Sequence, residues 1–492
     1  MTFRSEAVTR DGLQVQWFIR RSLAVVANLV LAGGLVAAPA IAASPTPAPT
    51  PLVHSEWTQF GHDPARSGYN STEATISASN VDQLRLAWTA SSSGPVDNSP
   101  AAADGVVYVG LNGGLSALAV GCATGGGTCN PLWTTSGGDP VYSSPAVADG
   151  VVYAAGKGNL YAYAVGCASG GGICTPLWTA DIGGAPSSSP AVAGGVVYIG
   201  SYAGKVYAFD THCSRGGGTC TPLWTATTGG TTTSPAVADG VVYVGSWDGG
   251  LYAFGVGCAS GGASCTPLWT ATTGGVIASS PVVWDGIVYV GSHDGKLYAF
   301  DAKCSRGGGT CKPRWTADTG SEIDASSPVV ANGVVYIGNL AGKLFAYAVD
   351  CASDGGTCTP AWTADTGMFE TSPAVANGVI YVAADSLKAY AVDCASGGGT
   401  CAPLWTGTTK GSAVASPVVA DGVVYIGSVA GKLYAFALGG PPATSTVNEV
   451  PLGSSPFPLV PVSLLTAAIL ASIYRVRAAG PCKPVQRRGR GS

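Results

Sequence analysis

Charged residues are scarce in this chain: Asp, Glu, Lys and Arg make up 11% of its 492 residues, and the net charge is −4. That balance leaves no basic surface for nucleic acid, so this class of partner is excluded. Histidine is rarer still, with four residues, which leaves little material for acid–base catalysis or zinc sites. The sequence also has no apolar period of 3.6 residues, which excludes a helical solenoid.

Glycine is abundant, with 72 residues, and the chain repeats itself every 44 to 47 residues. Self-similarity at this period is a signature of propeller folds. The dipeptide Ser-Pro recurs eight times, at 99–100, 144–145, 189–190, 234–235, 280–281, 327–328, 372–373 and 416–417. Tryptophan recurs with it, at Trp88, Trp133, Trp178, Trp224, Trp269, Trp315, Trp362 and Trp405.

Each repeat unit contains four short strands. In the second unit, SSPAVADG (143–150) is an apolar run that ends in Asp-Gly, and VVYAAG (151–156) follows at once. Asp-Gly between two strands predicts a two-residue hairpin turn with positive φ. A second turn, an alternating aromatic strand and a PLWTA-type segment complete a unit. We therefore predict an all-β, eight-bladed propeller of four-stranded antiparallel blades, with the eight tryptophans packed between neighbouring blades.

The repeat region neither begins nor ends with a complete four-strand unit. The first tryptophan strand, LRLAWTA (84–90), precedes every other strand, whereas the last unit ends at LYAFAL (433–438) after three strands. The simplest arrangement makes 84–90 the fourth strand of the eighth blade. Main-chain hydrogen bonds would then close the ring and leave no free edge between the first and last blades.

Fourteen of the fifteen cysteines fall in seven local pairs, one on each continuous connection between the third and fourth strands. The pairs are Cys122/Cys129, Cys167/Cys174, Cys213/Cys220, Cys258/Cys265, Cys304/Cys311, Cys351/Cys358 and Cys394/Cys401. A zinc site needs four ligands at one point, and a catalytic redox pair has two intervening residues and does not recur in every blade. We predict disulfides across hairpin necks, each contributing about 2.5 kcal/mol in the chain-entropy model.

The chain ends predict export and a membrane anchor. Residues 1–43 resemble a signal peptide, with a basic start, an apolar run and an A-x-A site at 40–42. Arg20-Arg21 also faintly resembles a twin-arginine signal, although the general export pathway is favoured. Residues 44–56 form a Pro-rich linker before the propeller at 57–438.

The C-terminal part carries a second apolar run. After a linker at 439–456, residues 457–474 have the length of a short transmembrane helix. The basic residues of 475–492 predict a cytoplasmic tail, where Cys482 would be a free thiol. We expect an exported propeller, anchored in the cell membrane by one span.

The repeats resemble those of the pyrroloquinoline quinone (PQQ) propeller family. The resemblance covers residues 57–438 and rests on the lead-in 57–90 and on blade text such as SSPVVWDGIVYVGSHDGKLYAFDA (279–302). It implies the fold and the docking of tryptophans between blades. The family's dehydrogenases use adjacent cysteines over the cofactor, and none occur here. Its outer-membrane assembly lipoproteins use a lipid-anchoring cysteine, and no cysteine precedes Cys122.

We expect a non-catalytic binding or scaffold module whose partner is a protein or a small molecule. The loops from the fourth strand of one unit to the first strand of the next would form its active surface, because they vary most. Their acidic residues are Asp97, Asp139, Asp181, Asp318, Glu322, Asp324, Asp365 and Glu370. The alternative is a PQQ- and calcium-dependent dehydrogenase with a divergent site, and the resemblance alone suggests these cofactors. Asp318, Glu322 and Asp324 would then serve as calcium ligands and base.

Overall fold

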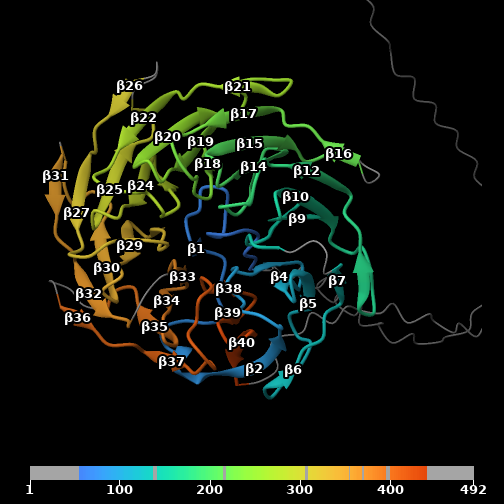
Figure 1. Ribbon diagram of the computed structural model, residues 1–492. Coiled ribbons are helices and arrows are strands. Elements are labelled where there is room, and N and C mark those ends of the chain that lie inside the picture. Colours follow the sequence, from blue (N-terminus) through green and yellow to red (C-terminus); the bar gives the residue numbers. More distant parts are fainter. Residues whose placement is uncertain are drawn as a thin grey trace, which may run out of the picture. The chain divides into compact units, whose positions relative to one another are not determined.

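Eight β-sheets form a ring around one axis in the computed structural model, which describes residues 55–136, 141–213, 218–304, 309–353, 355–367, 371–394 and 399–439 (Figure 1). The expected signal peptide, transmembrane helix and cytoplasmic tail lie outside these residues. Within them, no helix is long and apolar enough to cross a membrane. The predicted all-β, eight-bladed propeller is confirmed.

Each blade has four antiparallel strands, ordered from the axis outward. The innermost strands are β3 (Ala101–Ala103), β8 (Ala146–Ala148), β13 (Ala191–Ala193), β18 (Ala236–Ala238), β23 (Val282–Trp284), β28 (Val329–Ala331), β33 (Ala374–Ala376) and β38 (Val418–Ala420). The second strands are β4 (Val106–Leu111), β9 (Val151–Gly156), β14 (Val196–Gly200), β19 (Val241–Gly245), β24 (Ile287–Gly291), β29 (Val334–Gly338), β34 (Val379–Ala383) and β39 (Val423–Ser428). We number the blades 1 to 8 in this order.

The outer half of each blade contains the aromatic strand and the tryptophan strand. The third strands are β5 (Gly114–Ala119), β10 (Asn159–Ala164), β15 (Lys205–Asp210), β20 (Gly250–Gly255), β25 (Lys296–Asp301), β30 (Lys343–Ala348), β35 (Leu387–Ala391) and β40 (Lys432–Leu438). The fourth strands of blades 1 to 7 are β7 (Trp133–Thr135), β12 (Trp178–Asp181), β17 (Trp224–Thr227), β22 (Trp269–Thr272), β27 (Trp315–Asp318), β32 (Trp362–Asp365) and β37 (Trp405–Gly407).

The ring closes as predicted, with β2 (Leu84–Ser91) as the fourth strand of blade 8. It pairs antiparallel with β40 over its whole length, from Leu84 opposite Leu438 to Ser91 opposite Lys432. A short 3-10 helix, η1 (Val81–Gln83), leads into it. The first and last parts of the repeat region are thus joined within one sheet.

The hairpin turns between first and second strands have the predicted geometry. Asp149 and Gly150 have φ of 50° and 74°, and the other Asp-Gly and Asn-Gly turns match them. Positive φ at both central residues suits the right-handed twist of the flanking strands. These turns lie on one face of the ring, called here the turn face. Because the strands alternate in direction, the loops that lead into the innermost strands lie on the opposite face, called here the loop face.

All seven predicted disulfides are present, with Cα–Cα distances of 5.6–6.0 Å. The connections that carry them do more than the predicted hairpin clasp, because each adds a fifth, parallel strand to the preceding blade. These strands are β6 (Gly127–Thr128), β11 (Gly172–Cys174), β16 (Gly218–Cys220), β21 (Ala263–Cys265), β26 (Gly309–Cys311), β31 (Gly356–Cys358) and β36 (Thr400–Cys401). The disulfide therefore fixes a loop that links two blades.

Cys129 differs in its place from the second cysteine of the other six pairs. It is bonded to Cys122 as predicted, but β6 ends at Thr128, so Cys129 lies one residue beyond the fifth strand that each of the others ends. Its N–H still donates to the carbonyl oxygen of Thr89 in β2 at 2.7 Å. Its Sγ lies 3.9 Å from the carbonyl oxygen of Asn130, which is no thiol hydrogen bond because a disulfide sulfur carries no proton. The predicted disulfide within one blade is confirmed, and Cys129 in addition ties the connection of blade 1 to blade 8.

Seven of the eight tryptophans join blades in one way. The ring packs at 5.7–5.9 Å on a second-strand tyrosine of its own blade, as Trp224 does on Tyr198. Its Nε1–H donates to a carbonyl oxygen of the next blade at 2.7–3.3 Å, as Trp224 does to Val256. A buried indole N–H needs such a partner.

Trp405 in blade 7 departs from this pattern. It is half-buried and meets Phe436 of blade 8 edge-on, with ring centroids 5.2 Å apart. Leu438 stands where Val120 or Val256 supplies the acceptor in other blades, and it is paired with Leu84 instead. Blade 8 has no cysteine connection, so no fifth strand covers β37 among the described residues. The departure follows from the way the ring closes.

The Ser-Pro motif forms a belt of hydrogen bonds around the axis. At most junctions the N–H of the serine donates to the hydroxyl of its counterpart in the next blade at 2.9–3.0 Å, as Ser99 does to Ser144. The bond from Ser416 to Ser99 carries the belt across the closure. Seven of the eight junctions have this bond, so the motif that revealed the repeat also holds neighbouring blades together.

Candidate functional site

The axis of the propeller is filled by the chain's own residues 57–70. In blade 7, the short strand β1 (Tyr69–Asn70) pairs parallel with β33 on its axial side. Among the described residues, the first strands of the other blades have no strand beside them there, so their N–H and C=O groups need other partners. Residues 57–70 supply one partner to the middle residue of every innermost strand. The pairs, in blade order, are Trp57–Ala102, Thr58–Val147, Gln59–Val192, Pro64–Val237, Ala65–Val283, Ser67–Val330, Gly68–Val375 and Asn70–Val419, with donor–acceptor distances of 2.7–3.0 Å.

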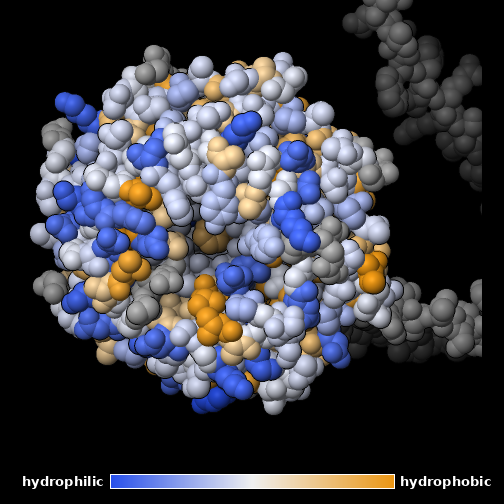
Figure 2. All heavy atoms as spheres, in the orientation of Figure 1, coloured by the Kyte–Doolittle hydropathy of each residue, from blue (hydrophilic) through white to orange (hydrophobic). Residues whose placement is uncertain are grey.

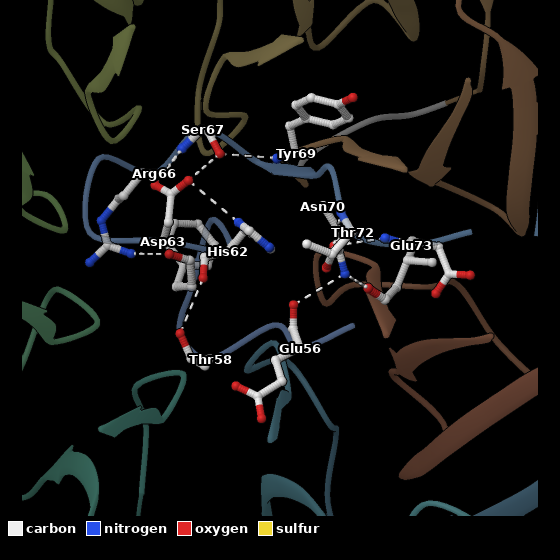
Figure 3. Close-up of polar contacts among 12 residues, drawn as sticks. Glu56, Thr58, His62, Asp63, Arg66, Ser67, Tyr69, Asn70, Thr72 and Glu73 are labelled. Carbon is white, nitrogen blue, oxygen red and sulfur yellow. Dashed lines mark hydrogen bonds and ion pairs between the residues drawn. The ribbon is translucent and has the colours of Figure 1, made fainter. Parts of the chain in front are cut away.

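The segment is held in shape by its own polar groups (Figure 3). Asp63 accepts hydrogen bonds from the backbone N–H and the hydroxyl of Ser67. Burial by itself raises the pKa of Asp63. Hydrogen bonds from His62 and Ser67 lower the pKa by more than this, so it lies below its ordinary value. Asn70 accepts from Thr72 and from the N–H of Glu73 through its side-chain oxygen.

Arg66 lies at the centre of this plug, with 1% of its surface exposed. Its guanidinium donates to the carbonyl oxygens of Phe60, Ser189 and Pro235. Two of these carbonyls belong to Ser-Pro motifs, so one side chain ties the plug to blades 3 and 4. Burial lowers the pKa of Arg66 to about 9, which leaves the group charged at neutral pH.

These contacts leave almost no free volume beside Trp57 and Arg66. The axial cavity beside Trp57 and Arg66 measures about 10 Å³, which is room for one water molecule at most. Nothing in the repeat pattern indicates this closure, because 57–70 carries no strand alternation. The burial of Arg66 is likewise not predictable from the sequence, because most of its partners are backbone carbonyls of distant repeats.

The loop face has a shallow depression of about 480 Å³ above the serine belt. Its lining residues are Asp97, Tyr142, Ser143, Ala185, Pro186, Ser187, Ser188, Ser189, Tyr202 and Ser234. The ring viewed along its axis is mostly hydrophilic and hollowed near its centre (Figure 2).

Three large aromatic side chains stand out on the loop face. Tyr142, Tyr202 and Trp247 are 57%, 56% and 51% exposed, although aromatic side chains of this size are usually well buried. Tyr202 and Trp247 meet edge-on with centroids 6.5 Å apart. Exposed aromatic groups gathered around a concave surface are typical of binding sites. Reasoning from the sequence selected the loops for their charge and missed these residues, two of which lie in turns between second and third strands.

The predicted acidic residues do not gather at one point. Asp318 caps its own turn by accepting from the N–H of Gly320 at 2.8 Å, and Glu322 is exposed. Asp324 lies 2.8 Å from Nε2 of His293. Asp139 and Glu370 lie outside the described residues. Within the described part of the chain, no three His, Cys, Asp or Glu side chains form a group that could hold a metal ion.

PQQ does not fit the residues that the structure describes. The cofactor is a planar tricarboxylate, which needs an enclosed slot and cationic partners. The axial cavity is too small for it, and no Lys or Arg lines the depression on the loop face, where Asp97 adds a negative charge. Among the described residues, no cluster of ligands for calcium is present.

Comparison with known proteins agrees with the fold. Residues 221–353 and 349–439 match a family model described as outer membrane protein assembly factor BamB. Residues 221–439 of the propeller are therefore similar to PQQ-like repeats of the BamB type. No curated protein matches the chain.

Solved structures share the architecture at low sequence identity. BamB from Moraxella catarrhalis is 16% identical, with a TM-score of 0.53 over 72% of this chain and 97% of its own. Quinohemoprotein alcohol dehydrogenase from Comamonas testosteroni is 16% identical, with a TM-score of 0.58 over 78% and 81%. The computationally designed Ika8 protein is also 16% identical, with a TM-score of 0.56 over 71% and 98%. At this identity the likeness shows the fold alone.

Proposed function

We propose that this protein is a non-catalytic binding or scaffold module that acts outside the cytoplasm, held at the cell surface by a C-terminal membrane span. One observation carries the proposal: the axis is filled by the chain itself, while the loop face displays exposed aromatic side chains around a depression. A propeller plugged in this way offers surface rather than an enclosed reaction chamber.

Further features support export and anchoring. Seven disulfides form most readily in an oxidising compartment. The apolar run 457–474, followed by a basic tail, has the composition of a single span with its positive end in the cytoplasm. The ligand of the loop face is a protein or a small molecule, and its aromatic contacts would provide most of the binding energy.

Removing the three aromatic side chains tests the proposal. We expect the triple variant Tyr142→Ala, Tyr202→Ala, Trp247→Ala to bind its partner more weakly. The amount of partner recovered from expressing cells by cross-linking and affinity capture should fall at least roughly tenfold. The melting temperature should be unchanged, because these side chains lie outside the core.

A matched control removes apolar surface elsewhere. Leu132 and Ile173 are exposed on the cysteine connections, away from the loop face, and their alanine variants should capture the partner normally. Equal capture by the triple variant and the wild type would contradict the assignment of the loop face as the binding surface.

A further inference from the structure

Radial grooves lie between neighbouring blades on the turn face, as between blades 2 and 3 and between blades 3 and 4, and at another junction the corresponding place is occupied by the chain itself. Between blades 7 and 8, residues 73–84 connect the plug at the axis to β2 at the rim (Figure 1). Ile76 and Val81 are fully buried there, in the cluster that includes Val379 and Val419. This segment shows how an extended peptide fits between two blades.

The inner end of the segment is fixed by Glu73. Its buried carboxylate accepts the N–H of Gly422, in the hairpin turn of blade 8, at 3.0 Å and the hydroxyl of Ser55 at 2.7 Å. It also accepts the N–H of Ile76 at 3.1 Å, so the acidic and the apolar anchor are locked three residues apart. From blade 7, Asn377 donates its side-chain N–H to the carbonyl of Ile76 at 2.9 Å.

The equivalent groove between blades 3 and 4 is open and apolar. It encloses about 610 Å³, and we call it the blade 3–4 groove. Its walls are formed mainly by Val196, Tyr198, Leu223, Trp224 and Val237, with Gly240 at the hairpin turn.

Corresponding residues are less buried in the blade 3–4 groove than in the occupied groove, because no described segment of the chain covers the blade 3–4 groove. Val379 and Gly422 are buried in the occupied groove, whereas their counterparts Val196 and Gly240 are half-buried and exposed. Corresponding strands and hairpin turns line both sites, although Gly194 of blade 3 stands where Asn377 lies in blade 7. The difference in burial at Val196 and Gly240 follows from the segment that covers only one of the two grooves.

A third groove shows a different way to cover the same surface. Blade 5 has Trp284 at the position that Ala193 holds in blade 3, the last residue of the innermost strand. Trp284 packs on the cluster between blades 5 and 6, and Ile287 beside it is 9% exposed. The chain thus covers this surface with its own atoms at two junctions, and alanine at position 193 leaves the blade 3–4 groove uncovered.

We propose that the blade 3–4 groove binds an extended peptide of a partner protein, with an acidic residue followed three residues later by Ile, Leu or Val. The carboxylate would accept the N–H of Gly240, as Glu73 accepts that of Gly422, and the apolar side chain would lie between Val196 and Val237. Asp239 beside Gly240 does not forbid an acidic anchor, because Asp421 holds the same place beside Glu73. The inference concerns the turn face and is independent of the proposal for the loop face.

The chain's own segment provides the probe. A fluorescent synthetic peptide with the sequence of residues 71–84, STEATISASNVDQL, should bind the full-length protein with saturable anisotropy. The variant Ala193→Trp should weaken this binding at least tenfold, because its indole would cover the groove as Trp284 does between blades 5 and 6. Its melting temperature and circular dichroism should match those of the wild type.

Two altered peptides distinguish specific binding in the groove from non-specific apolar binding. Peptides with Glu73→Gln or Ile76→Asp should each bind at least tenfold more weakly than the parent peptide to the wild-type protein. No saturable binding of the parent peptide would overturn the proposal. Equal binding of the parent peptide to the Ala193→Trp variant and to the wild type would also overturn it. A third contradicting result is that detergent monomers displace the peptide while the Glu73→Gln change has no effect, which would identify a non-specific apolar site.

Discussion

Replacing Arg66 with Met should lower the free energy of unfolding by at least about 3 kcal/mol, because three buried carbonyl oxygens lose their donor at roughly 1–3 kcal/mol each. Met fills much of the volume of the arginine stem but donates no hydrogen bond. The carbonyl oxygens of Phe60, Ser189 and Pro235 would then be buried without the guanidinium that they now share. Chemical denaturation followed by tryptophan fluorescence measures the change.

Arg85 offers a matched control for this substitution. Its guanidinium is at the surface and donates only to nearby carbonyls, those of Asp82 and Leu84. Arg85→Met should therefore change stability by less than about 0.5 kcal/mol. Similar losses in the two variants would mean that Arg66 does not organise the axis.

Deleting residues 81–90 should lower the melting temperature by roughly 10 °C or more. The deletion removes η1 and most of β2, which exposes the edge of β40 and takes the Trp88 ring from the junction between blades 8 and 1. Blade 8 would become a three-stranded sheet with a free edge. Differential scanning calorimetry measures the effect, and an unchanged melting profile would contradict closure by β2.

A pair of single substitutions isolates the tryptophan within this closure. Trp88→Ala should cost about 3–5 kcal/mol, the usual range for a large buried aromatic side chain. Trp405→Ala should cost clearly less, because that ring is half-buried and its Nε1–H has no acceptor among the residues that the structure describes. Equal losses would mean that Trp405 is as important to its junction as the other tryptophans are to theirs.

The repeat made most of the fold predictable from the sequence. Asp-Gly pairs, Ser-Pro pairs and tryptophans are local signals, and their phase along the chain placed β2 in blade 8. The number of disulfides follows from the same strand count. Seven blades have a continuous connection between their third and fourth strands that can carry a cysteine pair, and blade 8 has none. Each inference needed only short-range spacing and a count of strands.

The parts that could not be predicted depend on contacts between distant residues. Cys174 belongs to blade 2, but the short strand that it ends pairs with β7 of blade 1. Cys129 likewise belongs to blade 1, yet its N–H donates to β2 of blade 8. Gln59, Arg66 and Asn70 occur in a stretch without alternation, and their partners are carbonyl and N–H groups of the backbone. Such groups carry no sequence signature, so the sequence does not predict that residues 57–70 fill the axis.

The candidate site was predicted least well, again for a physical reason. The loops were chosen for their acidic residues, yet Asp318 and Asp324 are engaged in local contacts. The exposure of Tyr142, Tyr202 and Trp247 depends on which tyrosines and tryptophans the blades bury. Because the sequence has 20 tyrosines and 12 tryptophans, composition alone cannot identify the exposed ones.

Our central proposal is that this propeller binds through its surfaces and does not hold a quinone. Titration of the full-length protein with PQQ and calcium, followed by absorbance and by dye reduction with alcohols and sugars, tests it most directly. The plugged axis predicts neither saturable cofactor absorbance nor turnover above the protein-free rate. A stoichiometric cofactor spectrum with substrate-dependent dye reduction would contradict the account.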